Sequence, residues 1–148
     1  RRRVEVPEGG RDLELIRAFT EAVEEELSLW DEMDELERDL DDRRLGRKDY
    51  NRRRAILDQR VRTLTSSLTS LKQKVRQAGS GYVEYVVRLE AAEGEFALLR
   101  GDLAKLRGQS RTGRISRSVF EKLQDDNQKR INRARSAIER VILDLRGR

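Results

Sequence analysis

The sequence contains no cysteine and no histidine, only one proline, and few aromatic residues, which make up 5% of the 148 residues. Without cysteine, disulfides, thiolate zinc sites and cysteine nucleophiles are excluded. Without histidine, the chain lacks the commonest general base and the commonest ligand of transition metals. We therefore expect no catalytic residues, no metal site, no cofactor and no small-molecule substrate, and we expect that the protein is not an enzyme.

Long hydrophobic runs are also missing. No apolar run approaches the roughly 20 residues that a membrane-spanning helix needs, and no segment resembles a secretory signal. We therefore expect a cytoplasmic protein. The chain begins with RRRVEVPEGG and not with methionine, so we interpret it as a fragment of a longer protein or a processed form.

Apolar residues recur at alternating spacings of three and four, which predicts long amphipathic helices although 41% of the residues are charged. Four such stripes are present. The first consists of Leu15, Phe19, Ala22, Glu26, Leu29, Met33, Leu36 and Leu40, and is widened by Ile16, Val23, Leu27 and Trp30; the second consists of Leu57, Val61, Leu64, Leu68, Leu71 and Val75. The third consists of Tyr82, Tyr85, Leu89, Ala92, Phe96, Leu99, Leu103 and Leu106, and the fourth of Asn127, Ile131, Ala134, Ile138, Val141 and Leu145, preceded by Phe120 and Leu123.

Short turn signals separate the stripes: RRLGRKDY, AGSGY and GQSRTGRIS. They predict an all-α fold of two tandem antiparallel helical hairpins that form an elongated four-helix bundle or coiled coil, with two open, extended hairpins as the alternative. The expected division is a flexible leader over residues 1–11, a hairpin over 12–78 with Asp12 as its N-cap, a linker over 79–81 and a second hairpin over 82–148.

The two halves of the chain match when Arg44 is aligned with Arg114. Arg44-Leu45-Gly46-Arg47 then falls on Arg114-Ile115-Ser116-Arg117, which predicts an internal repeat. The alternative is that two hairpins use similar turn residues independently. The stretch GRISRSVFEKL, and more weakly RLGRKDYNRRR, resembles the SHOCT-type short helical module, a resemblance from which we transfer no function.

Charge is segregated in the first half. Residues 12–42 carry 14 acidic and 2 basic side chains, whereas residues 43–78 carry 12 basic and 2 acidic ones. We expect the two helices to neutralise each other, which weakens the inference from a basic isoelectric point to nucleic-acid binding. Glu26 lies within an apolar stripe, and we expect it near Asn127 or Arg54 as a polar layer that fixes register.

A concentration of arginine lies at the two predicted hairpin turns. If both turns lie at one end of a bundle, they form a positive pole that could bind phosphates of an anionic membrane surface or of nucleic acid. The alternative is a solubilising surface. The candidate anion-binding residues are Arg43, Arg44, Arg47, Lys48, Arg52, Arg53, Arg111, Arg114 and Arg117, with Arg54 and Arg107 beside them.

The third predicted helix carries glycine at every seventh position, opposite its core stripe. Each glycine inside a helix costs roughly 1 kcal/mol relative to alanine, so we expect the face to be packed closely against another helix. The candidate interface residues are Ala91, Gly94, Ala97, Leu98, Gly101, Ala104 and Gly108. The alternative is an exposed helix face under little constraint.

These patterns favour a non-catalytic scaffold or assembly module that self-associates as a homo-oligomer or docks another helical protein. The second hypothesis is a phosphate-binding module that places its arginine-rich end on anionic membranes or nucleic acid. No sequence motif identifies the partner.

Overall fold

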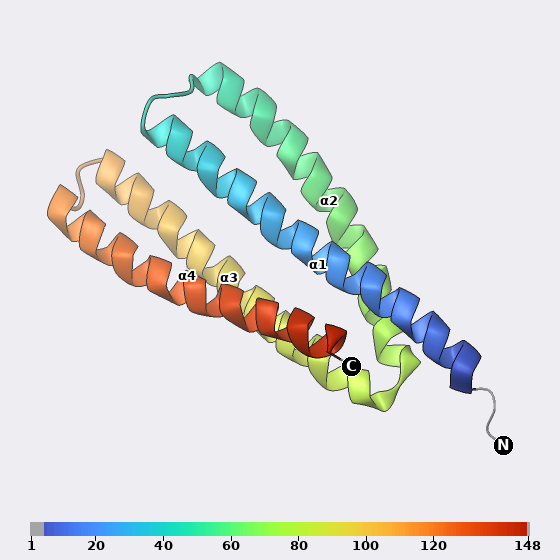
Figure 1. Ribbon diagram of the computed structural model, residues 1–148. Helices are drawn as coiled ribbons and strands as arrows, with labels where there is room; N and C mark the ends of the chain where they lie inside the picture. Colours follow the sequence, from blue (N-terminus) through green and yellow to red (C-terminus); the bar gives the residue numbers. More distant parts are fainter. Residues whose placement is uncertain (1–4, 148) are drawn as a thin grey trace. The chain divides into compact units, whose positions relative to one another are not determined.

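The computed structural model describes the backbone of residues 5–147 and the side chains of residues 12–147. Four helices form this part of the chain, which contains no strand (Figure 1). They are α1 (Glu5–Asp41), α2 (Arg47–Ala78), α3 (Ser80–Arg111) and α4 (Arg117–Arg146). The predicted all-α, four-helix class is confirmed.

The chain divides into two compact units at Tyr82, which we describe one at a time. Hairpin 1 consists of α1 and α2, and hairpin 2 consists of α3 and α4. Both are antiparallel. In hairpin 1, Arg60 of α2 bonds to Glu32 of α1. In hairpin 2, the side-chain amide of Asn127 reaches the backbone carbonyl of Leu99, and Arg88 near the start of α3 pairs with Asp144 near the end of α4.

The start of α1 differs from the prediction. The helix begins at Glu5, so Asp12 is not its N-cap, and most of the predicted leader is helical. Pro7 lies in the first helical turn, where backbone amides have no partner within the helix and proline is tolerated. Residues 1–4 of the predicted leader lie outside the described residues. The predicted linker is also shorter, because only Gly79 lies between α2 and α3.

The two hairpin turns have the same backbone geometry at the positions that the sequence alignment makes equivalent. In the first turn, the amides of Asp42, Arg43 and Arg44 bond to the carbonyls of Arg38, Leu40 and Asp39. In the second turn, the equivalent amides of Thr112, Gly113 and Arg114 bond to the equivalent carbonyls, those of Gly108, Ser110 and Gln109. Left-handed residues also occur at equivalent places, Arg43 with φ 60° and Gly113 with φ 76°. The geometry supports the predicted repeat.

The predicted stripes form the cores of the hairpins. Phe19, Leu29, Leu89, Leu99 and Ile138 are among the most buried side chains. The sequence analysis missed Thr20, Val86 and Ile142, which are buried beside the stripes. Leu123, which precedes the fourth stripe in the sequence, has an exposed side chain, and the buried residues of α4 begin at Asn127.

A polar cluster joins α1 to α2 next to the first turn. The Tyr50 hydroxyl donates to the Glu37 carboxylate, and Arg54 donates to Glu37, to the Tyr50 oxygen at 2.9 Å and to Asp58 at 3.0 Å. Burial raises the pKa of the Tyr50 phenol, and the Glu37 carboxylate raises it further. Burial alone would lower the pKa of Arg54, but its bonds to Asp58 and Tyr50 outweigh that effect. Arg54 is thus occupied by these groups and is not the predicted partner of Glu26.

Hairpin 2 has a single polar residue in its core stripe. Asn127 is buried, and its Nδ2 donates to the backbone carbonyl of Leu99 at 3.0 Å. Its Oδ1 has no hydrogen-bond partner. The equivalent residue of hairpin 1 is Leu57, which is also buried. A buried amide costs stability but favours one helix register, because only that register supplies its partner.

Candidate interaction surfaces

The outer face of α3 is exposed, as the predicted interface requires. Of the seven candidate residues, only Gly108 is partly covered. A Cβ atom built on Gly94, Gly101 or Gly108 would have no heavy atom within 4 Å. The glycines therefore do not serve a close helix contact within hairpin 2. A predicted contact with another molecule stays a prediction.

Two valines extend this face beyond the predicted residues. Val83 and Val87 are exposed, and together with Leu98 they follow the spacing of three and four residues along one side of α3. Val87 is 57% exposed and Leu98 is 62% exposed. We define the outer stripe of α3 by Val83, Val87, Ala91, Gly94, Leu98 and Gly101. The sequence alone could have predicted these two valines, because the spacing of three and four residues continues from Ala91 toward the N-terminus.

The outer stripe makes α3 apolar on two opposite sides. Tyr85, Leu89, Phe96 and Leu103 line its buried side, and the outer stripe lies opposite them. A helix at the surface of a globular protein normally has one apolar stripe, with charged residues on the other face. The outer stripe runs from Val83 to Gly101, which is about 27 Å at about 1.5 Å per residue. The outer stripe therefore departs from the ordinary composition of an exposed helix face.

Two of the predicted anion-binding arginines near the first turn pair with nearby acids. Arg44 pairs with Asp39 at 3.7 Å and Asp42 at 3.6 Å, and Arg52 pairs with Asp49 at 3.4 Å. The Arg47 guanidinium lies over the Tyr50 ring, 5.7 Å from its centroid. Residues 33–50 contain seven acidic and five basic side chains. Arg43, Arg44, Arg47 and Lys48 thus lie in a segment with a net negative charge, whereas Arg52 and Arg53 lie beyond it.

The second turn is different. Residues 103–120 contain five basic side chains and no acidic one. Arg117 pairs with Glu121 in the next helical turn at 3.2 Å, while Arg114 is exposed. Arg107 is buried, with 8% of its surface exposed, and does not belong to the exposed cations. The prediction that the two turns form one pole concerns the placement of the hairpins and stays a prediction.

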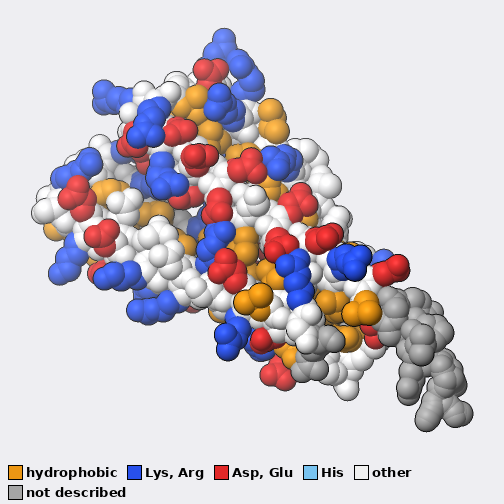
Figure 2. All heavy atoms as spheres, viewed as in Figure 1, with side chains coloured by type: hydrophobic (Ala, Val, Ile, Leu, Met, Phe, Trp, Pro, Cys, Tyr) orange, Lys and Arg blue, Asp and Glu red, His pale blue; other side chains and the backbone are white. Residues whose placement is uncertain are grey.

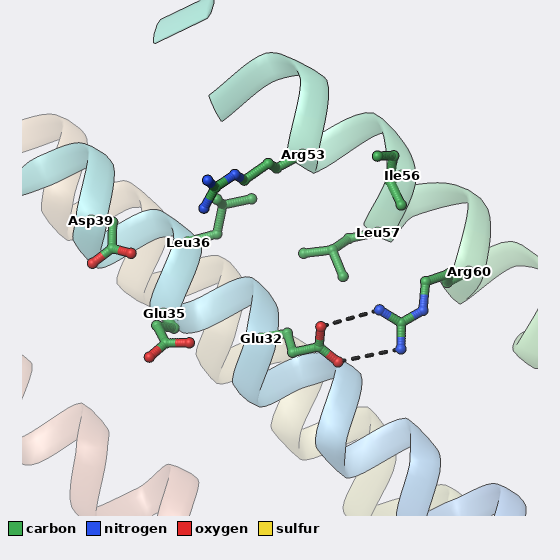
Figure 3. Close-up of a pocket in the computed structure, with 8 residues that line it drawn as sticks. All are labelled: Glu32, Glu35, Leu36, Asp39, Arg53, Ile56, Leu57 and Arg60. Carbon is green, nitrogen blue, oxygen red and sulfur yellow. Dashed lines mark hydrogen bonds and ion pairs between the residues drawn. The ribbon is translucent and has the colours of Figure 1, made fainter. Parts of the chain in front are cut away.

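A groove of about 250 Å³ lies between α1 and α2 (Figure 3). Glu32, Glu35 and Asp39 line it from α1, and Arg53 and Arg60 line it from α2. Arg60 spans the groove to Glu32 through two bonds, at 3.1 and 3.4 Å. Acidic and basic side chains are likewise mixed over the molecular face shown in Figure 2. Arg54–Glu37 and Arg60–Glu32 are ion pairs between acidic α1 and basic α2, and the extent of charge neutralisation in hairpin 1 stays a prediction.

Among the described residues, no group of three or more acidic, histidine or cysteine side chains is arranged to hold a metal ion. Within the same residues, none of the helices has a segment that is both long and apolar enough to cross a membrane. No protein-family model matches the chain, and no curated protein matches it either.

Proposed function

We propose that this protein is a non-catalytic assembly module that self-associates through the outer stripe of α3. The observation that carries the proposal is the second apolar side of this helix, with Val87 and Leu98 more than half exposed. Burial of apolar surface is the main favourable term in most protein association, about 25 cal/mol per Å². Gly94 and Gly101 leave room for another backbone to approach this surface.

The equivalent positions of hairpin 1 show that the outer stripe is not a requirement of the hairpin fold. Leu13, Arg17, Glu21, Glu24, Ser28 and Asp31 stand on α1 where the outer stripe stands on α3. Four of these six side chains are charged, which is the composition expected for a solvated helix face. The same backbone motif thus tolerates a charged face, and the apolar composition of α3 is attributable to a contact.

The test is the mass of the full chain, measured by sedimentation velocity over a wide range of concentrations. We expect a mass above that of the monomer, and we expect Leu98→Glu to shift the chain toward monomer because it places a carboxylate in the apolar contact. Ser66→Glu, at an exposed position of α2, is the control and should leave the mass unchanged. A monomeric wild type, or a Leu98→Glu variant of unchanged mass, contradicts the proposal.

A second candidate function is phosphate binding at the second turn, favoured by the absence of acidic residues over 103–120. Binding to inorganic polyphosphate or to anionic vesicles should weaken steeply with salt, because each neutralised phosphate releases counterions. Arg114→Gln with Arg117→Gln should reduce this binding more than Arg44→Gln with Arg47→Gln, the equivalent changes in the acid-rich first turn. Equal binding by both double variants would refute this candidate.

A further inference from the structure

Hairpin 2 contains a groove between α3 and α4 whose walls are rich in arginine. The groove has a volume of about 670 Å³. Arg88 lines it from α3, and Arg130, Arg133 and Arg140 line it from α4, while alanines, including Ala92 and Ala134, form part of its lining. We call it the arginine groove. Glu95 is the single acidic residue among the side chains that line it.

Two of these arginines have no acidic partner. Arg88 and Arg140 both pair with Asp144, at 3.1 and 3.8 Å. Within the part of the chain that the structure describes, neither Arg130 nor Arg133 forms an ion pair. Both are exposed on α4. The planar guanidinium suits carboxylates in particular, because it can form two parallel hydrogen bonds with one.

The equivalent surface of hairpin 1 has a different charge. In the alignment of the two halves, Arg88, Arg133 and Arg140 correspond to Ala18, Thr63 and Ser70, and only Arg130 has a basic counterpart, Arg60. On the α1 side of this surface, Glu21 takes the place of Ala91, and Glu25 takes the place of Glu95. Together with Glu14 they are exposed, and within the described residues they form no ion pair. Among the described residues, the unpaired charges that α4 contributes to the groove are therefore positive, whereas those on this side of α1 are negative.

We propose that the arginine groove binds the acidic face of α1, formed by Glu14, Glu21 and Glu25, from a second copy of this chain. This inference rests on the proposed self-association and names a surface for it. Glu14 and Glu25 are separated by about 16 Å along their helix, and Arg130 and Arg140 by about 15 Å, so the charged stretches match in length. The alanine lining allows a helix to approach closely and offers it apolar contact.

The groove is also continuous with the outer stripe of α3, because Ala91 belongs to both. A helix seated in the groove would therefore lie beside the stripe that we propose as the apolar contact. Nucleic acid is the less suitable occupant, since no aromatic side chain lines the groove for stacking on bases.

The experiment is a charge swap in the full chain, read by the dissociation constant from sedimentation equilibrium at low salt. Arg130→Glu with Arg133→Glu should weaken association roughly tenfold or more, because like charges then face each other. Glu21→Arg with Glu25→Arg should weaken it similarly. The variant that combines all four changes should recover most of the loss, which a merely structural effect would not produce. Lys122→Glu with Lys129→Glu is the matched control on α4 and should change association little.

Several outcomes separate this inference from the proposed function. If the wild type is monomeric, both fail. If it associates and Leu98→Glu disrupts association, but the arginine double variant does not, the proposed function stands and the groove inference is wrong. Failure of the combined variant to recover association, with each variant folded by circular dichroism, also overturns it. Loss of inorganic polyphosphate binding in the arginine double variant, without a change in its association, would make the groove a phosphate site instead.

Discussion

Helices α1 and α3 occupy equivalent places in the two hairpins, yet their outer faces differ in kind. On α1 the outer face carries Arg17, Glu21, Glu24 and Asp31, whereas the equivalent residues of α3 are Val87, Ala91, Gly94 and Gly101. The buried sides of both helices are apolar. The comparison separates two requirements: both hairpins have an apolar core stripe, whereas the composition of the outer face differs between them.

The largest expected effect concerns the cores of the two hairpins. Leu57 and Asn127 are equivalent and both buried. Leu57→Asn should cost about 3 kcal/mol of unfolding free energy, because it removes packing and buries an amide. Asn127→Leu should gain about 1 kcal/mol, since it removes the unpartnered Oδ1. Urea denaturation of the full chain measures both. If neither substitution changes the unfolding free energy, the assignment of these two residues to the cores is wrong.

The polar cluster at the first turn is the next test. Tyr50→Phe introduces the residue that hairpin 2 has at Phe120, and should cost about 1 kcal/mol because the bonds to Glu37 and Arg54 are lost. Phe120→Tyr should not raise stability by a matching amount, because Arg107 occupies the position equivalent to Glu37 and cannot accept a hydrogen bond from the new hydroxyl. Thermal denaturation of the two variants checks this difference, and a matching gain would refute it.

The same cluster predicts a dependence on alkaline pH. The pKa of Tyr50 is raised in the folded protein, first by burial and then by Glu37. Its contribution to stability is therefore fully present below the unfolded pKa of about 10 and is lost as the pH rises through the higher folded value. Tyr50→Phe should flatten the stability of the protein over this alkaline range relative to the wild type. If the stabilities of the two proteins changed with pH in the same way, the raised pKa of Tyr50 would be contradicted.

The turns offer a smaller and more local comparison. Arg43 and Gly113 both have positive φ, a conformation that costs a residue with a Cβ about 1 kcal/mol and costs glycine little. Arg43→Gly should thus raise the unfolding free energy by about 0.5 to 1 kcal/mol, and Gly113→Arg should lower it by a similar amount. Urea denaturation measures both changes. A loss of stability in Arg43→Gly would indicate that the Arg43 side chain makes a contact worth more than the strain.

The smallest expected effect concerns salt. Exposed pairs such as Arg60 with Glu32 contribute about 0 to 1 kcal/mol each and are screened by added salt. Since acidic α1 faces basic α2, hairpin 1 should lose more protection than hairpin 2 in amide hydrogen exchange when salt is raised to molar concentration. Equal changes in both hairpins would mean that charge segregation contributes nothing specific to hairpin 1.

The helices and their cores were predictable because periodic burial leaves a periodic sequence. Leu64, Leu68, Ile138 and Val141 follow from spacing alone. The start of α1 was not predictable, because Gly9 and Gly10 are typical of a loop and Asp12 is a good N-cap residue. Tyr50 was missed as a core residue, since its burial depends on contacts between α1 and α2 near the turn.

Candidate surfaces were less predictable than the core. The outer stripe was found through its glycines, and Val83 and Val87 were missed because the sequence analysis did not follow the same spacing back from Ala91. The arginine groove was not found at all. It combines residues of α3 and α4 that lie far apart in the sequence, and only the packing of the hairpin brings Arg88 and Arg130 to the same groove.

Gly79 is the one residue between α2 and α3, and this short covalent joint places both copies of the hairpin in one coding sequence. If the two hairpins were instead separate, identical chains encoded by one gene, every mutation would change both of them. In the joined chain, Glu24 and Gly94 can differ although they occupy the same structural position. Because both hairpins belong to one chain, a substitution on the outer face of one of them leaves the other unchanged.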